Sequence, residues 1–105
     1  MTQKQKIFAK IKSLVLRTEP KSKIILYGSY ARGDQRKDSD IDLLILVDRK
    51  KINREDEKRI TYPVYSLGTD TDNIISLIVK TKKEWETRYS ITPLFENIQR
   101  EGIEI

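Results

Sequence analysis

The sequence predicts an α/β domain in which helices pack on a small β-sheet. Predicted helices and strands alternate along the chain, an order that is typical of this fold class. The length of 105 residues suits one domain, so we expect residues 1–105 to form a single domain. Hydrophobic residues make up 37% of the chain, which supplies one core and leaves no surplus for a second.

The first two predicted elements are a helix over residues 2–18 and a strand over residues 23–27. Thr2 and Gln5 have the spacing of a capping box, and Pro20 stops the helix. One face of this helix is apolar, at Ile7, Ile11, Leu14 and Val15. The strand is a short apolar run and is therefore expected to be buried.

Gly28 follows that strand and predicts a tight turn, after which residues 29–34 resemble the start of a short helix. Residues 35–39 are polar and predict a loop. Residues 40–47 form the strongest strand of the chain. Beyond Asp42 both of its faces are apolar, which predicts a central position in the sheet.

The second half of the chain begins with a charged, helical pattern over residues 51–67, in which Pro63 is expected to kink or break the helix. Its apolar stripe is Ile60, Val64 and Leu67. Residues 74–79 predict a third strand, and residues 82–88 predict a short helix around Trp85.

A last helix is predicted over residues 92–101. Thr92 suits its N-cap, Pro93 its first position and Gly102 the position after its end. Its apolar face consists of Leu94, Phe95 and Ile98.

Composition narrows the chemistry that this chain can perform. It contains no cysteine, which excludes disulfides and thiolate metal sites, and no histidine, the usual general base and zinc ligand. Any metal must therefore be held by oxygen, which indicates magnesium, manganese or calcium. We see no secretory signal and no membrane span, and so expect a cytoplasmic protein that does not bind membranes.

The net charge of +5 is concentrated near the N-terminus. Residues 1–23 contain seven Lys or Arg and one acid, Glu19, whereas the other residues are almost balanced. This segment is either the solvated face of a helix or a patch for nucleic acid or an acidic partner.

The turn at Gly28 has the features of a phosphate site. Glycine permits a tight turn and a close approach by a ligand, and the start of a helix offers N–H groups and partial positive charge. Ser29 adds a hydroxyl, and Arg32 adds a cation one turn later. The alternative is an ordinary strand-to-helix turn with Ser29 as its N-cap.

Asp40 and Asp42 have the features of a metal site. Side chains two residues apart on a strand share a face, and two carboxylates side by side repel each other unless a cation lies between them. The alternative is an exposed acidic pair that Arg32, Arg36 or Lys37 neutralises. A phosphate site and a metal site joined by ten residues are what transfer from a nucleoside triphosphate requires.

Together these residues resemble the signature of the DNA polymerase beta-like nucleotidyltransferase superfamily, and the chain is similar to its minimal nucleotidyltransferases. The pattern Gly-Ser-x-Ala-Arg-Gly, then Ser-Asp-x-Asp-Leu, is matched by Gly28, Ser29, Ala31, Arg32, Gly33, Ser39, Asp40, Asp42 and Leu43. The resemblance implies a small mixed sheet flanked by helices, and it makes Gly28, Ser29, Arg32 and Ser39 nucleotide-binding. Asp40 and Asp42 become the catalytic metal ligands, with ATP or another nucleoside triphosphate as substrate and Mg²⁺ or Mn²⁺ as cofactor.

One departure from the family concerns a third acid, which usually lies on the next strand. Ser76 stands at the expected position in this chain. Asp70 and Asp72 lie just upstream, but their spacing is wrong for the usual face. This departure favours an alternative function, a weakly active or inactive module that binds nucleotide and a partner.

The resemblance also implies a partner protein. Larger relatives add a second domain that selects the acceptor, and we expect none here. Minimal forms in bacteria are often the antitoxin half of a toxin–antitoxin module and adenylylate a tyrosine of a small helical partner. Candidate contact surfaces are the basic N-terminal helix and the residues Ile91, Leu94, Ile103 and Ile105. Nucleic acid is not expected as the main partner, because only Phe8 interleaves the lysines of residues 4–23.

Overall fold

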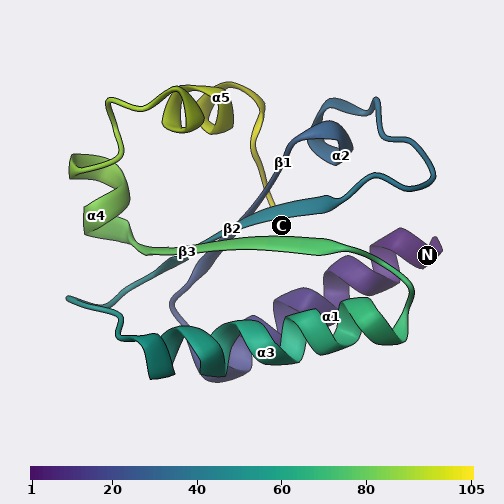
Figure 1. The fold of residues 1–105 in the computed structure, drawn as a ribbon, viewed down its shortest axis with the longest axis horizontal. Helices are drawn as coiled ribbons and strands as arrows, with labels where there is room; N and C mark the ends of the chain where they lie inside the picture. Colours follow the sequence, from purple (N-terminus) through teal and green to yellow (C-terminus); the bar gives the residue numbers. More distant parts are fainter.

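A four-stranded mixed sheet organises the computed structural model, which describes residues 1–105 (Figure 1). The strands lie in the order β3-β2-β1-β4. The central strands β1 (Lys23–Tyr27) and β2 (Ile41–Val47) are antiparallel, and β3 (Ile75–Thr81) runs parallel to β2. The short β4 (Ile103–Glu104) pairs antiparallel with the other edge of β1. This architecture confirms the predicted α/β class and the small mixed sheet.

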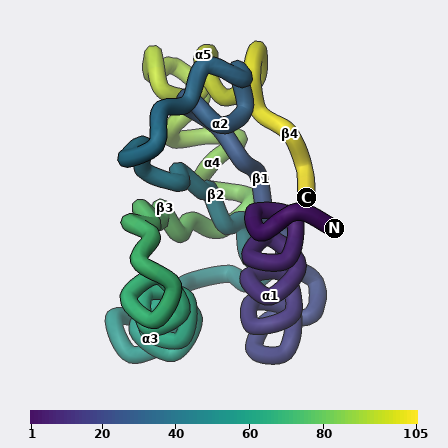
Figure 2. The backbone as a smooth tube through the Cα atoms, turned by 90° about the vertical axis from the view of Figure 1, so that its right-hand side faces the viewer, coloured from purple at the N-terminus to yellow at the C-terminus, as the bar shows by residue number.

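Two long helices cover one face of the sheet. Figure 2 shows α1 (Gln3–Thr18) and α3 (Arg54–Asp70) side by side below the strands. Thr2 and Gln5 form the predicted capping box of α1. The larger core lies between these helices and the sheet and comprises Ile7, Ile11, Val15, Ile24, Leu26, Ile41, Leu43, Ile45, Val47, Ile60, Val64, Ile75 and Val79.

The opposite face carries α4 (Lys82–Thr87) and α5 (Pro93–Glu101), and the four-residue α2 (Ser29–Arg32) lies on the same side (Figure 1). A smaller core joins these helices to β2, made of Leu44, Leu46, Trp85 and Ile98. No helix in the structure combines the length and the apolar character that crossing a bilayer demands.

Several boundaries differ from the sequence prediction, most of all those of α3. Helix α3 begins at Arg54, because Asn53 and Asp56 form a capping box there, and it continues through Pro63 to Asp70. Pro63 is exposed and does not break the helix as predicted, and the predicted stripe of Ile60, Val64 and Leu67 packs in the core. Strand β3 is shifted toward its C-terminal end and finishes at Thr81, which is buried and caps α4.

The C-terminal end of the chain holds the fourth strand, which the sequence did not predict. The N-cap of α5 at Thr92 and the break at Gly102 are as predicted, but Gly102 has a φ of −67° and not a left-handed conformation. A Cβ there would lie 2.5 Å from the Ile98 carbonyl oxygen and 2.7 Å from Cγ2 of Ile25. Gly102 is therefore needed for close packing of the end of α5 against β1.

Candidate active site

Three strands bring polar side chains together at one end of the sheet. Tyr27 at the end of β1 pairs with Asp42 near the start of β2, and Asp42 pairs with Ser76 on β3. Register partners project from the same face of a sheet, so these three side chains form a row. Leu44, two residues after Asp42, packs against α4 and α5, and the row therefore belongs to that face.

Gly28 joins the predicted phosphate turn to the predicted metal site. Its φ of 75° and ψ of −155° lie in a region that is nearly exclusive to glycine. A Cβ added there would collide with the Asp42 carboxylate. The backbone of the turn and the second aspartate are thus in direct contact, and any other residue at position 28 would displace one of them.

Ser29 is the first residue of α2, and the N-cap is Gly28. The Gly28 carbonyl oxygen accepts from the N–H groups of Ala31 and Arg32, which closes the single turn of this helix. The alternative in which Ser29 caps the helix is therefore wrong. Its hydroxyl makes no hydrogen bond in the structure and is partly exposed.

Arg32 is occupied by carboxylates. Its guanidinium donates to Asp34 at 3.2 Å and to the nearer oxygen of Glu101 at 3.2 Å. To contact a phosphate, Arg32 must exchange one of these partners or use N–H groups that they leave free.

Glu101, the last residue of α5, is a site residue that the sequence analysis missed. Its Oε1 accepts the backbone N–H of Gly28 at 3.2 Å, and its side chain is only 16% exposed. The carboxylate thus ties the end of α5 to both Gly28 and Arg32. The one local signal was an acid in the last turn of a helix, where the dipole disfavours negative charge unless a partner compensates for it.

Asp40 and Asp42 lie in different surroundings. Asp40 is exposed and immediately precedes β2, whereas Asp42 is half-buried within it. Burial, and then the charge of Asp40, raise the pKa of Asp42, and Arg32 offsets part of this rise. Burial and the nearby Asp42 likewise raise the pKa of Tyr27. Neither aspartate forms an ion pair, and Arg32 acts on Asp42 only through its nearby charge.

Ser39 shapes the loop that leads to Asp40. Its hydroxyl accepts the Arg36 N–H at 2.7 Å, and its own N–H donates to the Arg36 carbonyl oxygen. In this structure Ser39 therefore contacts the loop, and its predicted nucleotide contact stays a prediction.

The donor set suits a hard cation such as Mg²⁺. Two carboxylates repel each other at this point, and a cation bound by their oxygens would relieve that repulsion. No group of three or more acidic side chains comes together anywhere in the structure. Ser76 lies beside Asp42 as predicted, while Asp70 and Asp72 do not join the pair.

Sequence comparisons found a matching family model and a similar protein. The model of the family described as nucleotidyltransferase domain matches residues 5–99. A protein of Methanocaldococcus jannaschii that carries the name of a protein adenylyltransferase is 37% identical over 84 residues, covering 79% of this chain and 77% of that protein.

Several solved structures share the fold. A toxin–antitoxin complex with AMP-PNP superposes with a TM-score of 0.65 at 23% identity, over 91% of this chain and 69% of that chain. A doubly mutated MntA–HpeT toxin–antitoxin complex gives 0.62 at 20% identity, over 91% and 69%. A structure described as a minimal nucleotidyltransferase gives 0.62 at 24% identity, over 97% and 91%.

Proposed function

The chain belongs to the nucleotidyltransferase domain family, and from that premise we propose that it transfers AMP from ATP to a hydroxyl group of a partner protein. The observation that carries this proposal is the contact between Gly28 and Asp42. Through this contact, a glycine turn that suits phosphates lies directly beside a carboxylate that suits a metal ion.

Four residues bind the nucleotide in this proposal. Gly28 lets the phosphates approach the backbone, and the free hydroxyl of Ser29 donates to the outer phosphates. Arg32 contacts a phosphate after releasing Glu101 or Asp34, whose negative charges a triphosphate would replace. Ser39, in the loop that leads to Asp40, accepts the Arg36 N–H and can still donate its hydroxyl proton to the nucleotide.

Asp40 and Asp42 would hold Mg²⁺ or Mn²⁺ through their carboxylate oxygens. Such an ion, when bound, neutralises charge on the phosphates and on the departing pyrophosphate. The carboxylate of Asp42 is half-buried and therefore partly desolvated. Asp40 is exposed and accessible to an incoming acceptor.

The transfer itself is a substitution at the α-phosphorus of ATP. The acceptor oxygen forms a bond to that phosphorus, the bond to the pyrophosphate oxygen breaks, and the acceptor proton passes to solvent. The usual third acid, which helps to activate the acceptor, is replaced by Ser76, whose hydroxyl is no base at neutral pH.

A partner protein as acceptor is supported by the relatives. The Methanocaldococcus protein is named for adenylyl transfer to protein, and two of the solved relatives are toxin–antitoxin complexes, one of them with the ATP analogue AMP-PNP. We propose an antitoxin-like role, in which a small helical toxin-like protein is modified.

In a second version of the proposed function, the transfer of AMP is slow. The serine that pairs with Asp42 favours slow transfer, so that binding of nucleotide and partner would be the main effect of the protein. Measured turnover with the partner separates the two versions.

Calorimetry tests the nucleotide site directly. Wild type should bind ATP only with Mg²⁺, and the double variant Asp40→Asn/Asp42→Asn should lose this binding while remaining folded. Ser29→Ala should weaken ATP binding by roughly 1.5–3 kcal/mol, because a hydrogen bond to a charged group is lost, and should leave AMP binding nearly unchanged. Unchanged Mg-ATP affinity in the double variant would refute the assignment.

A further inference from the structure

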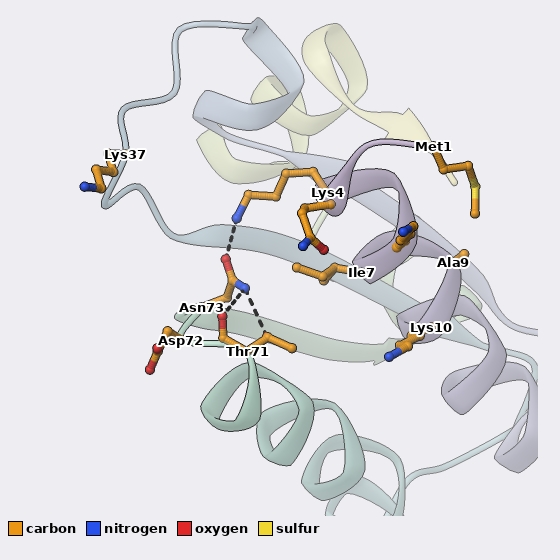
Figure 3. Close-up of a pocket in the computed structure, with 11 residues that line it drawn as sticks. Met1, Lys4, Ile7, Ala9, Lys10, Lys37, Thr71, Asp72 and Asn73 are labelled. Atoms are coloured by element: carbon orange, nitrogen blue, oxygen red, sulfur yellow. Dashed lines mark hydrogen bonds between the residues drawn. The ribbon is translucent and has the colours of Figure 1, made fainter.

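A cavity of about 730 Å³ lies outside the nucleotide site, between the first turns of α1 and the turn that joins α3 to β3 (Figure 3). Four lysines line it, three from α1 and one from the loop between α2 and β2: Lys4, Lys6, Lys10 and Lys37. Its only acidic lining residue is Asp72. A cavity with this balance attracts an anionic ligand.

Lys4 has a structural role in the wall of this cavity. Its ammonium group donates to Oδ1 of Asn73 and lies 5.2 Å from the centre of the Tyr30 ring. The contact with Asn73 joins α1 to the α3–β3 turn, as Figure 3 shows, and the contact with Tyr30 joins α1 to α2. The ammonium group of Lys4 is therefore already paired within the protein.

The other three lysines have no protein partner. Lys6, Lys10 and Lys37 are exposed and take part in no ion pair, whereas the buried Glu19 holds both Arg49 and Arg59. Lys6 and Lys10 are one helical turn apart and so project from the same side of α1. Their charge is available for a ligand from outside.

The rest of the lining indicates the kind of ligand. Met1, Ile7 and Ala9 contribute an apolar surface, and no aromatic side chain lines the cavity. Proteins that bind single-stranded RNA use aromatic rings for stacking, and this cavity offers none. A peptide with acidic residues around one apolar or aromatic side chain fits a surface with cationic and apolar parts.

The cavity continues toward the loop that carries Asp40. A second hollow of about 560 Å³ shares Lys37, Asp72 and Asn73 with it and is also lined by Asp38, Ser39 and Ile74. Ser39 directly precedes Asp40, and the Ile74 carbonyl oxygen accepts the Ile41 N–H on the other side of that aspartate. A chain bound along both hollows would reach Ser39, the residue before Asp40.

We propose that this lysine-lined cavity binds an acidic segment of the acceptor protein and so directs its hydroxyl side chain to Asp40. A tyrosine flanked by acids satisfies both parts of the lining, because its ring is apolar and its hydroxyl can accept the nucleotidyl group. The proposal rests on the proposed function for the fate of that hydroxyl, but not for the binding itself.

The test uses a short fluorescein-labelled peptide with one tyrosine between runs of glutamate, and its anisotropy with the whole protein. Wild type should bind the peptide, less tightly as salt rises. Lys6→Glu/Lys10→Glu should weaken binding by about tenfold or more, because two attractive charges become repulsive. Lys12→Glu/Lys21→Glu is the matched control, since both lysines are exposed and outside the cavity, and it should change binding by less than about threefold.

Three outcomes would overturn the proposal: no binding by wild type, equal loss in the two charge-reversal variants, or tighter binding of an oligouridylate of equal charge. The assay contains neither ATP nor metal, and Asp40→Asn/Asp42→Asn should bind the peptide at least as tightly as wild type does, because the two lost carboxylates can only repel it. Failure of the nucleotide site and failure of this cavity are therefore distinguishable.

Discussion

At the scale of single residues, the contact of Gly28 with Asp42 is the most demanding feature of the site. Gly28→Ala introduces a strained conformation and a collision with the carboxylate, and should lower the free energy of unfolding by about 1–3 kcal/mol and abolish Mg-ATP binding.

Gly33→Ala is the matched control for Gly28. Gly33 has a φ of 80° and no atom within 4 Å of an added Cβ, so it tests strain without collision. This variant should lose about 1 kcal/mol of stability and retain Mg-ATP binding. Denaturant unfolding and calorimetry measure both effects, and equal loss of binding in the two variants would show that the contact has no special role.

The raised pKa of Asp42 predicts that this carboxylate lowers the stability of the metal-free protein at neutral pH. Because the folded-state pKa is above the unfolded value, the ionised carboxylate destabilises the fold, and this penalty grows as pH rises between the two values. Asp42→Asn should therefore melt at a higher temperature than wild type at neutral pH, and the difference should vanish below the ordinary pKa of aspartate.

Mg²⁺ should stabilise wild type but not Asp42→Asn, since only the ionised carboxylate binds it. Asp40→Asn serves as comparison, because Asp40 is exposed and its removal should change the metal-free melting temperature less. A wild-type protein that is more stable than Asp42→Asn at neutral pH without metal would contradict this account.

Ser76 pairs with Asp42 and is the position at which a third acid would complete the metal site. Ser76→Asp should tighten Mg²⁺ binding by roughly tenfold, because it adds a charged oxygen ligand, and should lower stability without metal. Ser76→Asn adds similar volume without charge and should do neither. Calorimetric titration with Mg²⁺ that gives equal affinities for wild type and Ser76→Asp would refute this placement.

At the scale of elements, α5 is tied to the phosphate turn by Glu101. Glu101→Ala leaves the Gly28 N–H and the Arg32 guanidinium without this acceptor, and should lower the free energy of unfolding by about 1–2 kcal/mol. It should also speed amide exchange in the last turn of α5.

Asp34→Ala removes the other carboxylate from Arg32 and is the matched control. Because this pair is exposed, its loss should change stability by no more than about 0.5 kcal/mol. Equal effects of the two variants on unfolding would mean that Glu101 does not anchor α5.

Elements with strong local signals could be predicted from the sequence. The capping box at Thr2, the apolar run of β2 and the Thr92 cap lie where expected, since each depends on neighbouring residues. β4 could not be predicted, because two exposed residues carry no periodic pattern and their pairing with β1 is set by the packing of Gly102.

The residues of the candidate site also differ in whether the sequence predicts them. Gly28, Asp40 and Asp42 are close in sequence and form a recognisable motif, whereas Glu101 lies 73 residues from Gly28 and matches no motif. The raised pKa of Asp42 also depends on burial by the fold, which spacing along the chain does not reveal.

At the scale of the whole molecule, the two faces of the sheet carry different surfaces at the same end. Helices α2 and α5 lie on one side of the sheet, and α1 and α3 lie on the other (Figures 1 and 2). The nucleotide turn begins α2, whereas the lysine-lined cavity is formed mainly by α1 and the turn after α3. Of the apolar residues expected to contact a partner, Leu94 and Ile105 pack against the cores, while Ile91 and Ile103 remain exposed.

The intact mass of a partner protein after co-expression tests the central claim most directly. The proposed function predicts that the neighbouring gene encodes a small helical partner, which should co-purify with this chain and gain the mass of AMP, and should gain none with Asp40→Asn/Asp42→Asn. A partner that co-purifies but has the same unmodified mass with wild type and with the double variant would contradict the claim that this domain transfers AMP to it.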